Sequence, residues 1–194
     1  MTHVTEVKPL RADARRNREK ILVAARDAFT EQGAACSLDD VAKRAGVGPG
    51  TLYRHFATRE DLLQEVLGDW VEHITLDAER FAARDDLAPE DLLLEWFEAL
   101  LRHVIIYQGA SVAMLKAMDD PENPLYGSCR ALGLANEQVI ASVAGRGAVR
   151  DDVDALEIGR LVTGVANVVD AVGIRADEAR PMLRIVRDGV LRTR

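Results

Sequence analysis

The sequence predicts an all-α protein, and three observations support this fold class. Apolar residues recur at three- and four-residue spacings through most of the 194 residues. Glycine or proline interrupts these patterns where helices would end or begin. No stretch shows the sustained alternation of apolar and polar residues that is typical of a β-strand. We therefore predict about nine helices and no sheet.

The first two helices follow from local signals. Residues 1–14 lack helical periodicity, and we expect them to form a flexible basic arm. From Arg15 an apolar stripe indicates a helix that ends at Gly33. Ser37 is a favourable N-cap for a second, short helix, and Gly46 has the freedom to adopt the left-handed conformation that ends it.

Two further helices follow a connection that is too short to do anything but turn. The third begins at Gly50 and places Leu52 and Phe56 on one face. Thr58 is the expected N-cap of the fourth. Because its apolar stripe continues towards Phe81, we predict a single long helix from Thr58 onwards. Beyond it, the same signals predict helices over 89–107, 110–118, 126–143, 155–172 and 178–191.

The composition is that of a protein with a hydrophobic core and a charged surface. Hydrophobic residues make up 48% of the chain and charged residues 29%. No apolar run approaches the roughly 18 residues needed to cross a membrane. The polar N-terminus lacks the apolar segment of a secretory signal, so we expect a cytoplasmic protein with no membrane partner. Cys36 and Cys129 lack metal-binding spacing and are expected to be reduced thiols.

The second and third predicted helices have the arrangement of a DNA-binding helix-turn-helix, in which the second helix enters the major groove. The outward residues of that helix carry groups suited to DNA, namely the Thr51 hydroxyl, the Tyr53 phenol, and the donors of Arg54 and His55. For each residue alone, an ordinary solvated position is the alternative. The glycine spacing of the whole segment favours DNA binding.

The charge distribution agrees with a DNA-facing module attached to an acidic body. Residues 1–60 contain 11 Lys and Arg against 8 Asp and Glu, a balance of +3. Residues 61–194 contain 14 against 24, a balance of −10, which together give the net charge of −7. Basic charge on the first module favours approach to phosphates.

The segment from Ser37 to Leu62 resembles the signature of the TetR/AcrR family of bacterial regulators, and the resemblance extends from about Arg15 to Leu67. The shared features are Val-Ala at 41–42, Ala-Gly-Val at 45–47, Gly50, Leu-Tyr at 52–53 and Phe56. The chain departs from the family at Gly48, where serine is frequent, and at Arg59, where lysine is usual. We expect these residues to contact DNA: Ser37, Arg44, Gly48, Pro49, Gly50, Thr51, Tyr53, Arg54, His55 and Arg59.

The resemblance also implies a domain organisation and a function. It implies an N-terminal three-helix DNA-binding domain over 15–60 and a helical ligand-binding and dimerisation domain over 61–194 that includes the connecting helix. The expected function is a repressor that an unknown small molecule releases from a double-stranded DNA operator. Activation stays open, because the outcome depends on where the operator lies relative to the promoter.

The last two predicted helices, Ala155–Val172 and Glu178–Leu191, contain more apolar residues than one thin domain needs to bury. We expect two copies to pair through them as a four-helix interface, and the resulting homodimer to bind a palindrome-like site. The alternative is that all of these residues belong to the core of one chain.

Larger residues cluster in the middle helices, and we expect them to line a pocket for an apolar ligand. They are Trp96, Phe97, His103, Tyr107, Met114, Met118 and Tyr126. Packing in the core is the alternative for each of them.

Catalysis is not expected. The four histidines lack metal-ligand spacing, and the sequence contains neither a phosphate-binding loop nor a nucleophile elbow. We therefore expect no metal site and no cofactor.

Overall fold

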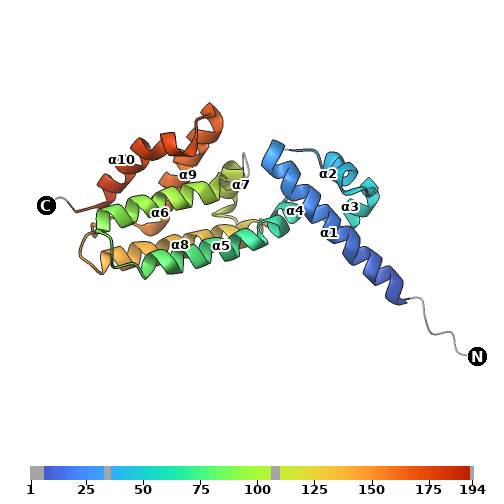
Figure 1. Ribbon diagram of the computed structural model, residues 1–194, viewed down its shortest axis with the longest axis horizontal. Coiled ribbons are helices and arrows are strands. Elements are labelled where there is room, and N and C mark those ends of the chain that lie inside the picture. Colours follow the sequence, from blue (N-terminus) through green and yellow to red (C-terminus); the bar gives the residue numbers. More distant parts are fainter. Residues whose placement is uncertain (1–6, 33–35, 106–109, 193–194) are drawn as a thin grey trace, which may run out of the picture. The chain divides into compact units, whose positions relative to one another are not determined.

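The computed structural model describes residues 7–32, 36–105 and 110–192. The chain divides into two compact units, residues 1–66 and 67–194. Ten α-helices and a short 3₁₀ helix form the regular structure of the described residues (Figure 1). The β pairing described is an isolated antiparallel bridge between Val149 and Leu191. The predicted all-α fold is confirmed.

The first unit contains α1 (Val7–Gln32), α2 (Leu38–Ala45), α3 (Pro49–His55) and α4 (Arg59–Val66). Helix α1 packs against the other three, so its apolar stripe forms the centre of this unit. The core is built from buried side chains of all four helices: Ile21, Ala25, Ala28, Phe29, Val41, Leu52, Phe56, Leu62, Leu63 and Val66.

Helix α1 begins earlier than the sequence predicts. We expected a flexible arm over 1–14, yet residues 7–14 belong to α1. Pro9 lies in the first turn, where backbone N–H groups have no intrahelical acceptor and a proline is tolerated. Residues 1–6 of the predicted arm lie outside the described residues.

The long helix predicted from Thr58 towards Phe81 is two helices. Helix α4 ends at Val66 and α5 (Gly68–Ala82) follows it, which raises the number of α-helices from nine to ten. Leu67 between them has φ −77° and ψ −6°, away from the usual helical ψ of about −42°. Gly68 follows at once, and glycine is a poor residue for helix continuation. The first unit therefore includes all of α4, beyond the boundary expected after residue 60.

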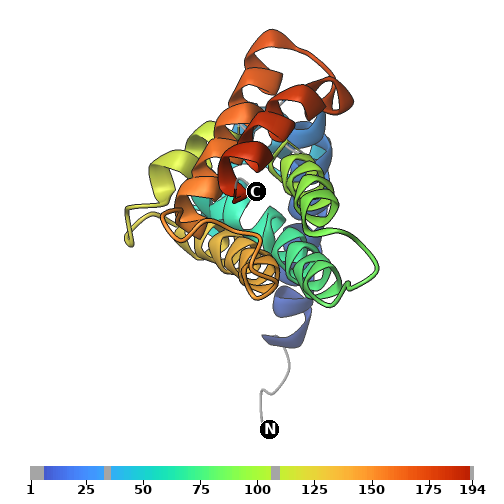
Figure 2. The same cartoon turned by 90° about the vertical axis from the view of Figure 1, so that its left-hand side faces the viewer.

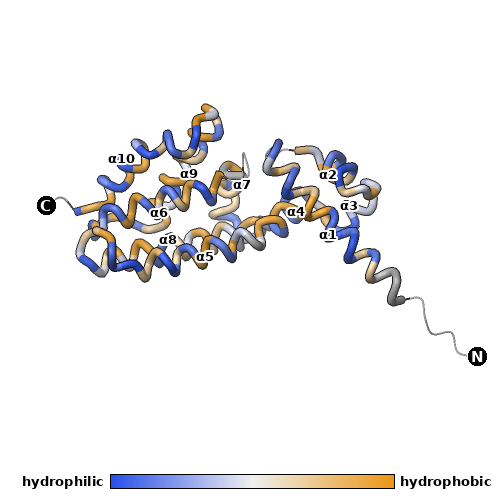
Figure 3. The backbone as a smooth tube through the Cα atoms, in the orientation of Figure 1, coloured by the Kyte–Doolittle hydropathy of each residue, from blue (hydrophilic) through white to orange (hydrophobic). Residues whose placement is uncertain are grey.

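The second unit is a bundle around α5, α6 (Pro89–Val104) and α8 (Tyr126–Ala144). Its other helices are α7 (Ala110–Ala117), α9 (Ala155–Val172), the 3₁₀ helix η1 (Ala176–Ala179) and α10 (Arg180–Val190). Helices α5 and α8 lie side by side and α6 packs against both (Figures 1 and 2). Helix α9 contacts α6, α7, α8 and α10. Polar and apolar stretches alternate along these helices, as amphipathic helices require (Figure 3).

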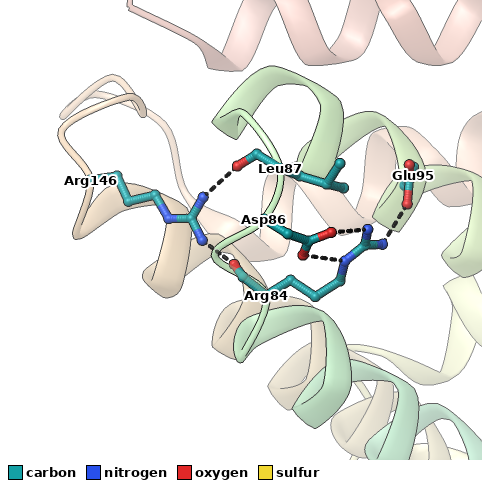
Figure 4. Close-up of polar contacts among 5 residues, drawn as sticks. All are labelled: Arg84, Asp86, Leu87, Glu95 and Arg146. Carbon is teal, nitrogen blue, oxygen red and sulfur yellow. Dashed lines mark hydrogen bonds and ion pairs between the residues drawn. The ribbon is translucent and has the colours of Figure 1, made fainter.

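Four charged side chains fasten the connection between α5 and α6 (Figure 4). The Arg84 guanidinium pairs with both oxygens of Asp86, at 3.0 and 2.9 Å, and with Glu95 at 2.7 Å. The hydrogen bonds from Arg84 lower the pKa of the Asp86 carboxyl. Arg146, which follows α8, donates to the main-chain oxygens of Leu87 and Arg84. This loop is thereby held against the end of α8.

Candidate functional site

The turn between α2 and α3 has the geometry that the sequence predicts. Ser37 is the N-cap of α2, and its hydroxyl accepts a hydrogen bond from Asp39 N–H at 3.2 Å. Gly46 ends the helix with φ 67° in the left-handed region. Val47 N–H then bonds to the Ala42 carbonyl at 3.0 Å. These contacts set the direction in which the chain enters α3.

Three exposed residues open α3. Gly48 is the N-cap, with extended backbone at φ −71° and ψ 149°, and its carbonyl accepts a hydrogen bond from Thr51 N–H at 2.9 Å. Pro49 occupies the first helical position, where the missing N–H removes no helical hydrogen bond. Because Gly50 also lacks a side chain, other molecules can approach the backbone closely here.

The predicted recognition residues lie on the outer side of α3. Leu52 is fully buried and anchors the helix to the unit. Tyr53 is 48% exposed, Arg54 is also exposed, and Thr51 and His55 are half-buried beside them. Tyr53 and Arg54 of α3 are therefore open to solvent, and Thr51 and His55 are partly so.

Arg44 and Arg59, two further predicted DNA contacts, already make contacts within the protein. Arg44 pairs with Glu31 of α1 at 2.7 Å, and this hydrogen bond raises the pKa of the guanidinium. Arg59 donates to the main-chain oxygen of Cys36. Burial raises the pKa of the Cys36 thiol despite the two nearby arginines. Both arginines therefore help to hold the α2 segment in place.

A clamp formed by Arg18, Phe56 and Glu65 was not expected from the sequence. Phe56 is the C-cap of α3, and the Arg18 guanidinium carbon lies 5.5 Å from the centre of its ring. The same side chain pairs with Glu65 of α4 at 2.7 Å. Arg18 thus connects α1 to α3 and α4, the two helices on either side of the turn that follows α3. Contacts between distant helices of this kind leave no local sequence signal.

In the second unit, the predicted ligand-binding residues divide into two groups. Trp96, Phe97 and Met114 are at most 2% exposed and lie in the core. Met118 and Tyr126 are half-buried and line a groove between α8 and the start of α9. Tyr107 lies outside the described residues. Core packing, the alternative left open above, describes the position of the first group.

His103 is a hydrogen-bonded histidine of the bundle. Its Nε2 lies 3.0 Å from Asp77 Oδ2, and its backbone carbonyl accepts a hydrogen bond from Trp70 Nε1 at 2.8 Å. The Trp70 and His103 rings meet edge to face, with their centres 6.3 Å apart. These contacts join α5 to α6.

A buried polar link through Asn136 was also not expected. Asn136 is 1% exposed; its Oδ1 accepts a hydrogen bond from Trp96 Nε1 at 3.0 Å, and its Nδ2 donates to the Ala155 carbonyl at 2.6 Å. The Trp96 ring meets Phe81 of α5 with centres 5.5 Å apart. The sequence signal is a polar residue between Leu132 and Val139 in the buried stripe of α8.

Part of the apolar surplus in the last two helices lies at the surface. Leu161, Val168 and Val172 of α9 are 57%, 43% and 67% exposed, and Ile185 of α10 is 73% exposed. We define these four residues as the α9–α10 apolar face. Other members of the surplus, such as Val162, Val169 and Leu183, are buried within the chain.

The described part of the chain contains no cluster of His, Cys, Asp and Glu side chains arranged to hold a metal ion. Each of its helices is too short or too polar to span a membrane.

Comparisons with known proteins match both units. Residues 21–66 match the family described as bacterial regulatory proteins, tetR family. Residues 88–192 match a C-terminal domain described as transcriptional regulator SbtR-like.

Individual relatives agree with these matches. The HTH-type transcriptional regulator UidR of Escherichia coli strain K12 is 31% identical over 133 residues, which cover 68% of this chain and 59% of UidR. A crystal structure of a TetR regulator from Streptomyces coelicolor is 28% identical with a TM-score of 0.58, covering 91% of this chain and 99% of that one. A TetR regulatory protein from Mycobacterium vanbaalenii is 30% identical with a TM-score of 0.53, covering 95% and 100%. All three relatives are described as transcriptional regulators. The chain belongs to the TetR family of DNA-binding transcriptional regulators, whose members bind DNA operators and dimerise.

Proposed function

We propose that this protein is a homodimeric repressor that a small molecule releases from its operator. The observation that carries the DNA-binding part is the exposed row on α3, with Tyr53 and Arg54 held outward by the buried Leu52. A helix that presents donors in this way fits the major groove. The relatives' descriptions as transcriptional regulators support the assignment to transcription.

The residues of the proposed interface have two roles. Thr51 and Arg54 face base edges, because a hydroxyl with its methyl group and a guanidinium are suited to thymine and guanine. Tyr53 and Arg59 bind phosphates, which fixes the register of the helix on the duplex. The Arg59 contact to Cys36 supports this role, because it holds the side chain at the start of α4.

Two copies pair through the α9–α10 apolar face. Leu161, Val168 and Val172 follow one another at seven- and four-residue steps and therefore lie along one side of α9. A soluble chain gains stability when such a stripe is covered by a partner. The dimer places two α3 helices on the two half-sites of a palindrome-like operator.

Release acts through α5, which follows α4 in the chain after the single residue Leu67. The contacts from Ala155 through Asn136 and Trp96 to Phe81 support this role, because they connect α9 with α5 through buried groups. A ligand that shifts α5 changes the separation of the two recognition helices, which must stay near about 34–36 Å for specific binding. Such coupling is typically about 1–3 kcal/mol and is reciprocal between ligand and DNA.

The test is transcription in vitro from the promoter upstream of the protein's own gene, with increasing amounts of the wild-type protein. Repression predicts that the transcript falls as protein is added, and that a ligand identified by thermal shift restores it. A rising transcript would show an activator. A ligand whose affinity is equal with and without saturating operator would contradict release.

A further inference from the structure

A groove of about 310 Å³ lies on the second unit where α8, the start of α9 and the chain after α7 meet. Helix α8 contributes Tyr126, Arg130, Leu134 and Glu137, and the start of α9 contributes Asp154 and Leu156. The four α8 residues follow at four-, four- and three-residue steps, so they line one face of that helix. The volume is at the lower end of the range of about 300–1,000 Å³ for small-molecule sites.

The groove exposes apolar surface that the chain itself does not cover. Leu134 is 52% exposed and Leu156 is 43% exposed, and they reach the groove from different helices. At 3.6 residues per turn, Leu156 is rotated by roughly 120–140° around α9 from Leu161 and Val168. The groove therefore lies away from the α9–α10 apolar face, and dimerisation through that face leaves it open.

The charged groups of the groove favour a cation. Glu137 and Asp154 contribute two negative charges against the one positive charge of Arg130. Asp154 is partly engaged, because its Oδ1 accepts hydrogen bonds from Leu156 N–H at 2.7 Å and Glu157 N–H at 3.3 Å. The Glu137 side chain makes no hydrogen bond or ion pair with any residue that the structure describes. Its carboxylate is thus the group best placed to bind a positively charged ligand.

We infer that this groove binds a small organic cation with an apolar body, such as a protonated arylalkylamine. The ammonium pairs with Glu137, and the apolar part covers Leu134 and Leu156 beside the Tyr126 ring, which also attracts cations. The Ala155 carbonyl at the groove is the acceptor of the Asn136 hydrogen bond. The role of this groove as the effector site rests on the proposed function. The binding of the organic cation itself does not depend on that function.

The experiment is isothermal titration calorimetry of the full chain, without DNA, at pH 7. The probes are 3-phenylpropylammonium chloride and sodium 3-phenylpropanoate, which share an apolar body and differ in charge. We expect saturable binding of the ammonium compound only. Glu137→Gln should weaken it about tenfold or more, because it removes a charge-assisted hydrogen bond. Arg130→Gln should leave it as tight or make it tighter.

Two controls separate the possible outcomes. Glu79→Gln, an exposed Glu on α5 outside the groove, should leave binding unchanged. Operator affinity of Glu137→Gln without probe should equal that of the wild type, so a loss of DNA binding is detected separately from a loss of probe binding. Equal binding of the two probes, no saturable binding, or equal effects of Glu137→Gln and Glu79→Gln would overturn the proposal.

Discussion

The two units keep their important polar side chains in opposite places. In the first unit, Tyr53 and Arg54 lie at the surface, while the core behind α3 is apolar. In the second unit, Asn136 lies in the core and bonds to the buried Trp96 and to the half-buried Ala155, which belong to other helices. Substitutions on α3 should therefore change DNA binding more than stability. Substitutions inside the second unit should change stability first.

The largest effects on stability and assembly are expected in α9, where a buried valine and an exposed valine are neighbours in the sequence. Val169→Asp places a charge at a side chain that is 5% exposed, and an unpaired buried charge costs more than about 4 kcal/mol. Val168→Asp places the same charge on the α9–α10 apolar face at a side chain that is 43% exposed. We expect Val169→Asp to unfold the second unit and Val168→Asp to give a folded monomer.

Circular dichroism and sedimentation distinguish these two results. Val169 is therefore not a suitable site for testing dimerisation, because its side chain belongs to the core of one chain. A dimeric Val168→Asp variant would contradict the proposed interface.

The next largest effect concerns the buried polar link. Asn136→Ala leaves the buried Trp96 Nε1 without its acceptor and removes a donor from the half-buried Ala155 carbonyl; a buried unsatisfied group costs about 1–3 kcal/mol. We expect a loss of about 1–3 kcal/mol in the free energy of unfolding, measured with urea. Gln138→Ala is the control, because Gln138 is exposed on the same helix and should change stability by less than about 0.5 kcal/mol. Equal midpoints for the two variants would contradict a structural role for Asn136.

The difference between the units also explains what the sequence predicts well. Caps and left-handed glycines act within a few residues and are therefore visible in the sequence itself. Ser37 marks the start of α2, Gly46 marks its end and the turn, and Thr58 marks the start of α4. The exposure of Tyr53 and Arg54 on α3 follows from the helical periodicity of the apolar residues around them. The limits of α9 were predicted to the residue, since Asp154 caps its start and Gly173, with φ 70°, ends it.

The remaining features depend on contacts between distant segments. An aromatic residue such as Trp96 looks the same in the sequence whether it lies in a core or in a ligand pocket. Its packing in the folded chain decides which of the two it is. In the clamp, Arg18 contacts Phe56, which is 38 positions away in the sequence, and Glu65, which is 47 positions away. The break at Leu67 has a weak local signal in Gly68, which the continuous apolar stripe obscures.

A smaller effect is expected at the cap of α4. Asp61 N–H donates to Thr58 Oγ1 at 3.0 Å, and Thr58 N–H donates to Asp61 Oδ2 at 2.9 Å. Thr58→Ala removes the first bond and should lower the free energy of unfolding by about 1 kcal/mol. Thr58→Ser keeps the hydroxyl and should retain most of the stability. If both variants lost the same stability in a urea titration, the hydroxyl would not be the cause.

Operator binding by the Tyr53→Ala, Arg54→Ala double variant tests the central claim most directly. Fluorescence anisotropy with a labelled upstream DNA fragment gives the affinity, and thermal unfolding of the same samples checks the fold. We predict a loss of at least about 1–3 kcal/mol in specific binding, with the unfolding temperature unchanged. Lys116→Ala, which removes an exposed positive charge from the second unit, should bind as the wild type does. Wild-type affinity in a folded double variant would show that α3 is not the recognition helix.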